Sequence, residues 1–175
     1  MNARADTAIE ERTLALAVPS IMEDEGFTPH WKQGILADWF IGYGFDQNGM
    51  AAKYLGEYLA DRTLTISPQS ARFILERVVK ELYPRVVRLY GDGWNDLNDN
   101  QRSALMNMAY QLGVAGLGRF KNMLAALRKG DLRGVALHAR HSPWYLEQTR
   151  ARAARVIVKL VGEEIFTATN TEDIA

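Results

Sequence analysis

The sequence contains no cysteine, which excludes a disulfide framework and a thiolate nucleophile. Its 21 basic residues balance 21 acidic ones, so it lacks the net positive charge typical of nucleic-acid-binding proteins. No apolar run approaches the roughly 20 residues of a membrane span, and the polar residues 1–12 do not form a secretory signal. We therefore expect cytoplasmic synthesis without a signal peptide, no stable membrane insertion and no nucleic-acid partner.

The charge is less even along the chain than its sum suggests. Between Arg119 and Lys159 there are ten Lys and Arg residues against only Asp131 and Glu147. Such an excess attracts an anionic polymer, although a solvated helical surface has the same composition. A chain of 175 residues with 47% hydrophobic residues is long enough to bury a core as one domain, with one lobe or two.

The N-terminal part predicts two helices separated by a proline. Apolar residues recur at helical spacing over 7–18, and Pro19 should interrupt that helix. Pro19 and Ser20 can then start a short second helix, which carries Glu25 and ends at Gly26. Glu25 is thereby expected at the last turn of a helix.

The remainder predicts a small sheet followed by a helical body. Glycines alternate with aromatic and β-branched residues over 27–50, which favours short antiparallel strands and tight turns. Ser67 and Pro68 are a helix start signal, and Pro84 should kink or end that helix. We predict a single α+β, mostly helical domain over 1–175. Its expected parts are a sheet-containing lobe at about 20–66, a helical lobe at about 67–166 and a flexible tail at 167–175.

Glu25 is the first candidate for chemistry. A general acid of a glycosidase must hold a proton near neutral pH, which apolar surroundings favour. The neighbouring Met22, Phe27, Trp31 and Trp39 are able to provide such surroundings, and aromatic rings also stack on sugars. A Glu-Gly pair at a helix end is nevertheless common without any function.

Three separated motifs add to this weak signal. The first is Glu-Gly-Phe at 25–27 with Phe-Ile-Gly-Tyr-Gly at 40–44, which places Gly42 seventeen residues after Glu25. The second is Gln-Arg-Ser-Ala-Leu-Met-Asn-Met-Ala-Tyr-Gln-Leu-Gly at 101–113, with Phe120 after it. The third is Ser-Pro-Trp-Tyr at 142–145, then Gln-Thr at 148–149 and Arg-Ala at 152–153. In order and spacing these resemble the phage-type lysozyme (endolysin) family over about residues 20–165, and the resemblance implies a lysozyme-like fold.

The resemblance also implies roles for individual residues. Glu25 matches the general acid of the family, and Arg152 matches an arginine that pairs with that acid and orients it. Gln111 matches a polar residue of the cleft, and Asn107 lies one turn before it on the same helix face. Trp144 is expected as a buried anchor, with the Gln-Thr pair at 148–149 starting the last helix.

The sequence departs from the family pattern at three places. Gly34 stands where the family usually has Asp, Phe40 where it has Thr, and Phe45 where it has His. Either Asp38 or Asp46 is able to replace the missing carboxylate, and Asp38 is the better candidate because it lies in the same turn-and-strand segment. An exposed turn aspartate without function has the same appearance.

Two further explanations stay open for the missing carboxylate. Glu25 can act almost alone, as in lytic transglycosylases, or catalysis is lost while glycan binding or a structural role in a phage particle remains. Trp39 and His30 are additional substrate-binding candidates in the cleft segment.

The resemblance implies a muramidase that cleaves the bond between N-acetylmuramic acid and N-acetylglucosamine in bacterial peptidoglycan. The alternative is a catalytically impaired lysozyme-like module that binds cell wall or builds a phage particle. We expect no cofactor and no metal, and a monomer that acts on the periplasmic wall after release or as part of a virion. A holin-type pore or virion proteins are the expected delivery partners.

Overall fold

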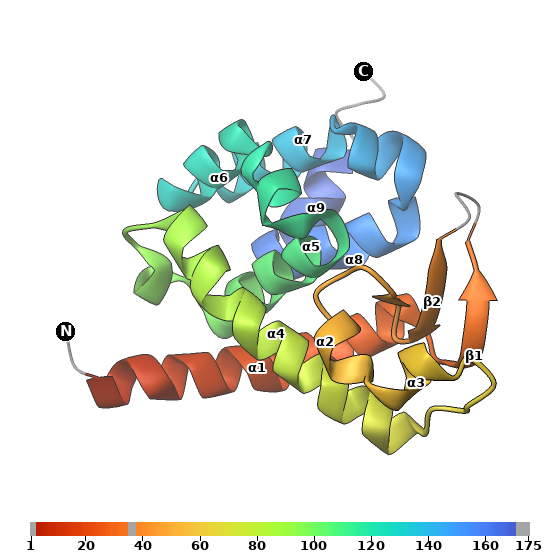
Figure 1. Cartoon of the computed structure of the whole chain (residues 1–175). Coiled ribbons are helices and arrows are strands. Elements are labelled where there is room, and N and C mark those ends of the chain that lie inside the picture. Colours follow the sequence, from red (N-terminus) through yellow and green to blue (C-terminus); the bar gives the residue numbers. More distant parts are fainter. Residues whose placement is uncertain (1–2, 35–37, 171–175) are drawn as a thin grey trace. The chain divides into compact units, whose positions relative to one another are not determined.

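The computed structural model describes residues 3–34 and 38–170, which form mostly helices and one small sheet (Figure 1). The strands are β1 (Thr28–Gln33), β2 (Trp39–Gly42) and β3 (Phe45–Asp46), which form an antiparallel sheet in the order β1-β2-β3. The helices are α1 (Ala3–Glu25), α2 (Ala52–Leu55), α3 (Glu57–Ala60), α4 (Pro68–Tyr90), the short turn η1 (Trp94–Asp96), α5 (Asp99–Gly118), α6 (Lys121–Arg128), α7 (Leu132–Arg140), the π-helical turn η2 (Trp144–Gln148), α8 (Arg150–Val161) and α9 (Glu163–Asn170). The predicted α+β, mostly helical fold is confirmed.

The chain divides into two compact units. The sheet unit comprises Val18–Glu81, and the helical unit comprises Met1–Ala17 together with Leu82–Ala175. The sheet unit extends beyond the predicted limit near residue 66 because the first half of α4 packs within it. A methyl group on Gly42 of β2 would lie 3.4 Å from Cβ of Ala71 in α4.

Both long helices continue through a proline, contrary to the sequence prediction for Pro19. Helix α1 is continuous over Pro19, so the predicted second short helix does not exist, and α4 runs on past Pro84 to Tyr90. Each proline lies on an exposed position, and so do Ala15 and Lys80, whose carbonyl groups lose their helical donor. Water can solvate these carbonyls, which explains why the helices do not end there.

Two further features concern helix boundaries. Helices α2 and α3 are separated at Gly56, whose φ of 43° is outside the right-handed helical region. At the other end, residues 167–170 belong to α9 and are not part of a tail, because Thr169 is buried and its hydroxyl donates to Ile165 O at 3.0 Å. The rest of the predicted tail, 171–175, lies outside the described residues.

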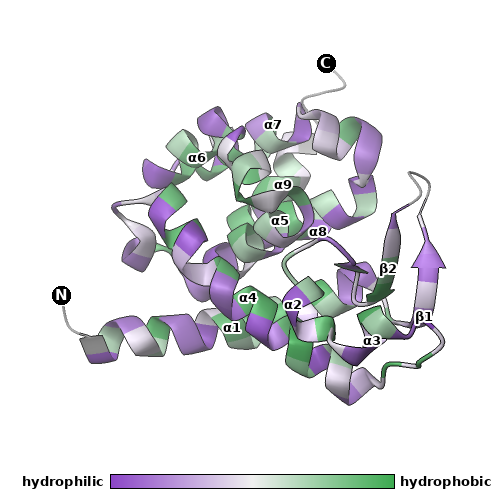
Figure 2. Cartoon of the chain, viewed as in Figure 1, coloured by the Kyte–Doolittle hydropathy of each residue, from purple (hydrophilic) through white to green (hydrophobic). Residues whose placement is uncertain are grey.

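The helical unit is built around α5. Residues 101–109 of this helix are buried without interruption, and its middle is pale to green in the hydropathy view of Figure 2. Gly113, at φ 72° and ψ 162°, breaks the helical geometry, whereas Gly116 and Gly118 lie within α5. The break separates the buried core turns from the short segment that leads to Phe120.

Candidate active site

Glu25 occupies the last position of α1, as predicted. Gly26 follows with φ 67° and donates its N–H to Met22 O at 3.1 Å, which is a left-handed helix terminus that favours glycine. The Glu25 side chain is half-buried, and its Oε2 lies against Gly44 in the turn between β2 and β3. A methyl group on Gly44 would lie 2.9 Å from that oxygen, so a larger residue here would displace the carboxylate from its present place.

Asp38 lies directly beside the position where the family pattern has its aspartate. Gly34 and Asp38 close the β1–β2 hairpin, with Gly34 N–H donating to Asp38 O at 2.7 Å. A Cβ on Gly34 would lie 2.5 Å from Oδ1 of Asp38, so the Asp38 carboxylate fills space that a side chain at 34 would take. The residue is exposed, and its carboxylate is accessible to water.

The other replacement candidate, Asp46, has a local structural use. Its Oδ1 accepts the backbone N–H of Asn48 at 2.6 Å and thereby fixes the turn after β3. Phe45 is almost fully buried, with its ring against Gly42, so the residue at the family's histidine position belongs to the core. The replacement of the missing carboxylate by Asp38 or Asp46 stays a prediction.

Trp39 and His30 have neighbours within the sheet unit that the sequence did not reveal. The guanidinium carbon of Arg62 lies 5.1 Å from the centre of the Trp39 ring and 5.5 Å from that of Trp31. His30 is exposed, and its Nδ1 lies 3.4 Å from the Thr65 hydroxyl. One face of Trp39 is thus occupied by Arg62, and the substrate-binding roles of Trp39 and His30 stay predictions.

Asn107 and Arg152 form a buried pair in the helical unit. Oδ1 of Asn107, on α5, accepts from Nε of Arg152 at 3.1 Å and from its Nη2 at 3.0 Å. Asn107 is fully buried and Arg152 is 8% exposed. This arrangement holds the guanidinium plane of Arg152 in one orientation. Its predicted pairing with Glu25 stays a prediction.

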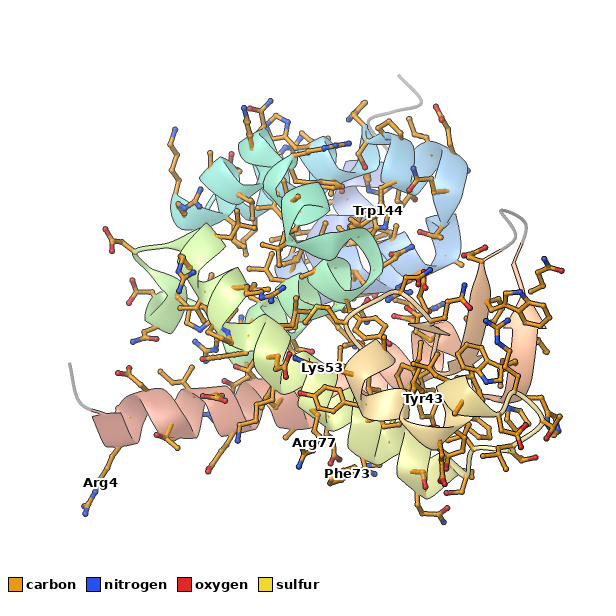
Figure 3. All side chains as sticks on the ribbon, in the orientation of Figure 1. Arg4, Tyr43, Lys53, Phe73, Arg77 and Trp144 are labelled. Atoms are coloured by element: carbon orange, nitrogen blue, oxygen red, sulfur yellow. The ribbon has the colours of Figure 1, made fainter. Side chains whose placement is uncertain are left out.

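Gln111 links two other motif residues rather than presenting an unused amide. Its Oε1 accepts from the indole N–H of Trp144 at 2.9 Å, and its Nε2 donates to the Thr149 hydroxyl at 3.1 Å. Trp144, labelled in Figure 3, is buried, which agrees with the anchor role expected for it. Thr149 lies at the N-terminus of α8, which is followed by α9 and is therefore not the last helix, contrary to the sequence prediction. Its side chain makes no capping hydrogen bond, because it serves Gln111 instead.

A basic pocket of about 700 Å³ opens within the helical unit. Four basic residues line it: Arg119, Lys121, His138 and His141. The lining includes no acidic residue. Phe120 and Trp144 supply an aromatic part of the wall, with their ring centres 5.7 Å apart. Such a lining suits a ligand with carboxylate groups and some apolar surface.

Neither a metal cluster nor a membrane helix is found in the described parts of the chain. Over 3–34 and 38–170, no three His, Cys, Asp or Glu side chains are grouped so that they could hold a metal ion. None of the helices in those ranges combines the length and the hydropathy that a bilayer crossing requires.

Sequence reasoning missed two features of this site. Gly44 was part of a recognised glycine motif, and only the structure shows that it makes room for the Glu25 carboxylate. Arg62 belongs to no motif, and no periodicity points to it. A contact between residues 23 or 31 positions apart, such as Arg62 with Trp39 or Trp31, leaves no trace in a single sequence.

The fold is that of a lysozyme-like module: one unit contains a small antiparallel sheet and carries Glu25 and Asp38, and the other is helical and contains a buried Asn–Arg pair. A family model described as phage lysozyme matches residues 22–154, and the chain therefore belongs to the phage lysozyme family.

Curated relatives are similar over part of their length. The chain is 32% identical over 112 residues to the pre-baseplate central spike protein Gp5 of Enterobacteria phage T4. The aligned residues cover 62% of this chain and 19% of that protein. It is 33% identical over 64 residues to probable T4-type lysozyme 2 of Dictyostelium discoideum. Those residues cover 37% of each of the two chains. The chain thus spans about a fifth of the first relative and just over a third of the second.

Proposed function

We propose that this chain is a muramidase that hydrolyses the bond between N-acetylmuramic acid and N-acetylglucosamine in peptidoglycan. Glu25 is the general acid that protonates the leaving glycosidic oxygen, and Asp38 is the carboxylate that takes a proton from the attacking water. The water oxygen bonds to the anomeric carbon as the carbon–oxygen bond to the leaving sugar breaks.

The observation that carries this proposal is the position of Glu25 at the end of α1, with its carboxylate against Gly44. A rigid helix end and a glycine turn restrict where the carboxyl group can lie, as a proton donor to a fixed oxygen requires. Membership of the phage lysozyme family supports the same role.

Asp38 is supported by its contact with Gly34. The carboxylate that the family pattern has at position 34 is missing, and the side chain of Asp38 lies within 2.5 Å of where the Cβ of such a residue would be. Asp38, four residues after Gly34, thus supplies a carboxylate in nearly the same part of the hairpin. Its exposure leaves it able to activate a water molecule.

The basic pocket of the helical unit is proposed to bind the peptide stems of the wall, which carry carboxylate groups. The pocket contains Arg119 and Lys121 and no acidic side chain, so its field favours such groups. Asn107, Gln111 and Arg152 then act by fixing the helical unit through their hydrogen bonds.

The test is release of reducing sugar ends from purified sacculi by the wild type and by Glu25→Gln and Asp38→Asn. Glu23→Gln is the matched control, since Glu23 is an exposed carboxylate on the same helix. We expect both site variants to lose at least about 100-fold in rate, as expected when a general acid or base is removed, and the control to keep it. Equal release by Glu25→Gln and wild type would contradict the proposal.

A second candidate function is supported by the similarity to a spike protein, which is a structural part of a phage particle by name. In that case the chain binds cell wall or assembles into a virion without cleaving glycan. Retention on sacculi without release of soluble muropeptides would favour this function. Mass analysis of released products separates a hydrolase from a transglycosylase, because hydrolysis leaves a reducing end and transglycosylation an anhydro end.

A further inference from the structure

A planar cation lies against both indole rings of the β1–β2 hairpin. Trp31 lies on β1, and Trp39 lies on β2, where it pairs with Gln33. Arg62 is within cation–π distance of both rings, at 5.5 Å from Trp31 and 5.1 Å from Trp39. The guanidinium group thus contacts one aromatic ring from each of the two strands.

A third contact ties Arg62 to Gln47, the residue that follows β3. Nη2 of Arg62 donates a hydrogen bond to Oε1 of Gln47, and the backbone N–H of Gln47 donates to Trp39 O at 3.1 Å. Arg62 therefore holds Trp39 twice, directly through its ring and indirectly through Gln47. Lysine cannot reproduce this, because only the flat guanidinium of arginine stacks on rings and donates sideways at the same time.

The loop that carries Arg62 is itself fixed by a local turn. Oδ1 of Asp61 accepts the backbone N–H of Thr63 at 2.9 Å and its hydroxyl at 2.7 Å. These two hydrogen bonds lower the pKa of Asp61 below its usual value, because they stabilise the ionised carboxylate. On the other side, Trp31 is anchored by its indole N–H, which donates to Tyr58 O at 2.8 Å.

Arg62 and Gln47 thus both contact Trp39, the residue next to the proposed second carboxylate, Asp38. Trp39 directly follows Asp38, whose carbonyl oxygen accepts from Gly34 and whose carboxylate lies over Gly34. We infer that Arg62 is a positioning residue for the reaction: by holding Trp39 it holds the Asp38 carboxylate in its place over Gly34. This inference rests on the proposed function, since it assigns Arg62 an effect that acts through Asp38.

The test compares Arg62→Ala and Arg62→Lys with Arg77→Ala in the full chain. Arg77 is the matched control: its guanidinium carbon lies 4.9 Å from the ring of Phe73 and 5.6 Å from that of Tyr54, also in the sheet unit (Figure 3). We expect Arg62→Ala to lower kcat about 10-fold with little change in KM, because a slightly misplaced catalytic group slows the chemical step. Arg62→Lys should be intermediate, and Arg77→Ala should keep the wild-type kcat.

A double variant separates positioning from general destabilisation. If Arg62 acts through Asp38, adding Arg62→Ala to Asp38→Asn should cost no further activity. A merely structural role would lower the rate of the double variant again. Additive losses, or an Arg62→Ala protein with the kcat of Arg77→Ala, would overturn the inference.

Amide hydrogen exchange gives a readout that does not need turnover. The Gly34 N–H, which donates to Asp38 O, should exchange faster in Arg62→Ala than in wild type or Arg77→Ala. Unchanged exchange at Gly34 would overturn the inference by itself. Absence of turnover in the wild type would instead reject the proposed function, and the catalytic part of this inference with it, so the two failures are distinguishable.

Discussion

Replacing Gly44 by alanine tests the position of the Glu25 carboxylate directly. The φ of Gly44 is 73°, a region that costs an L-residue about 1–2 kcal/mol. For a chain of this size each kcal/mol corresponds to about 2–4 °C in Tm, so we expect a fall of about 2–8 °C. The added methyl group would also lie 2.9 Å from Oε2 of Glu25, which must move by about half an ångström to regain ordinary contact at 3.4 Å.

The displacement of the carboxylate predicts a loss of activity beyond the loss of stability. A displacement of about 1 Å can cost about 100-fold in rate, so half of that predicts a loss on the order of 10-fold. Gly130→Ala is the control, because Gly130 has a φ of 70° and a methyl group there would meet no atom within 4 Å.

The assay is kcat on solubilised peptidoglycan at a temperature well below both transitions, together with thermal unfolding. The two variants should lose similar stability, and only Gly44→Ala should lose turnover. If Gly44→Ala keeps the kcat of Gly130→Ala, the carboxylate of Glu25 does not need the place that the structure gives it, and the reasoning is refuted.

Three further changes have defined outcomes. Asn107→Ala removes the acceptor of two buried Arg152 donors and should cost about 2–4 kcal/mol in the free energy of unfolding, measured in urea; a loss below about 1 kcal/mol would contradict it. The hydrogen bond from Arg102 lowers the pKa of Asp99, so its contribution to stability is present above the unfolded-state value near 4 and is lost as the pH falls through the folded-state value. Asp99→Asn should flatten this acid-side decline in Tm, and an unchanged pH profile would count against it. Pro19→Ala restores a helical donor at an exposed site and should raise the free energy of unfolding by about 1–3 kcal/mol; a lower Tm would argue otherwise.

Local sequence signals predicted the elements that depend on neighbouring residues. Ser67 caps α4 by accepting the N–H of Ser70 at 3.0 Å, and Gly26 ends α1. Each of these features is decided within about four residues, so composition and spacing were sufficient to place them.

The same local signals were wrong for Pro19. Proline was expected to end a helix because it lacks a donor and crowds the preceding turn. The structure shows that the freed carbonyl belongs to an exposed residue, while Ala17, Val18 and Ile21 on the other side are buried. Burial of that apolar face outweighs one lost hydrogen bond, and no window of sequence shows which side faces water.

In the candidate site, too, the sequence predicted local features and the tertiary structure decided the contacts between distant residues. The sequence alone determined that the chain has a lysozyme-like pattern, that Glu25 ends a helix, and that the family's second carboxylate is absent at Gly34. Only the tertiary structure decided that Asp38 lies over Gly34, that Gly44 makes room for Glu25, and that Arg62 contacts both Trp31 and Trp39. The reason is physical: helix ends and turns are set by short-range backbone hydrogen bonding, whereas a carboxylate's surroundings come from side chains that the folded chain brings together across loops.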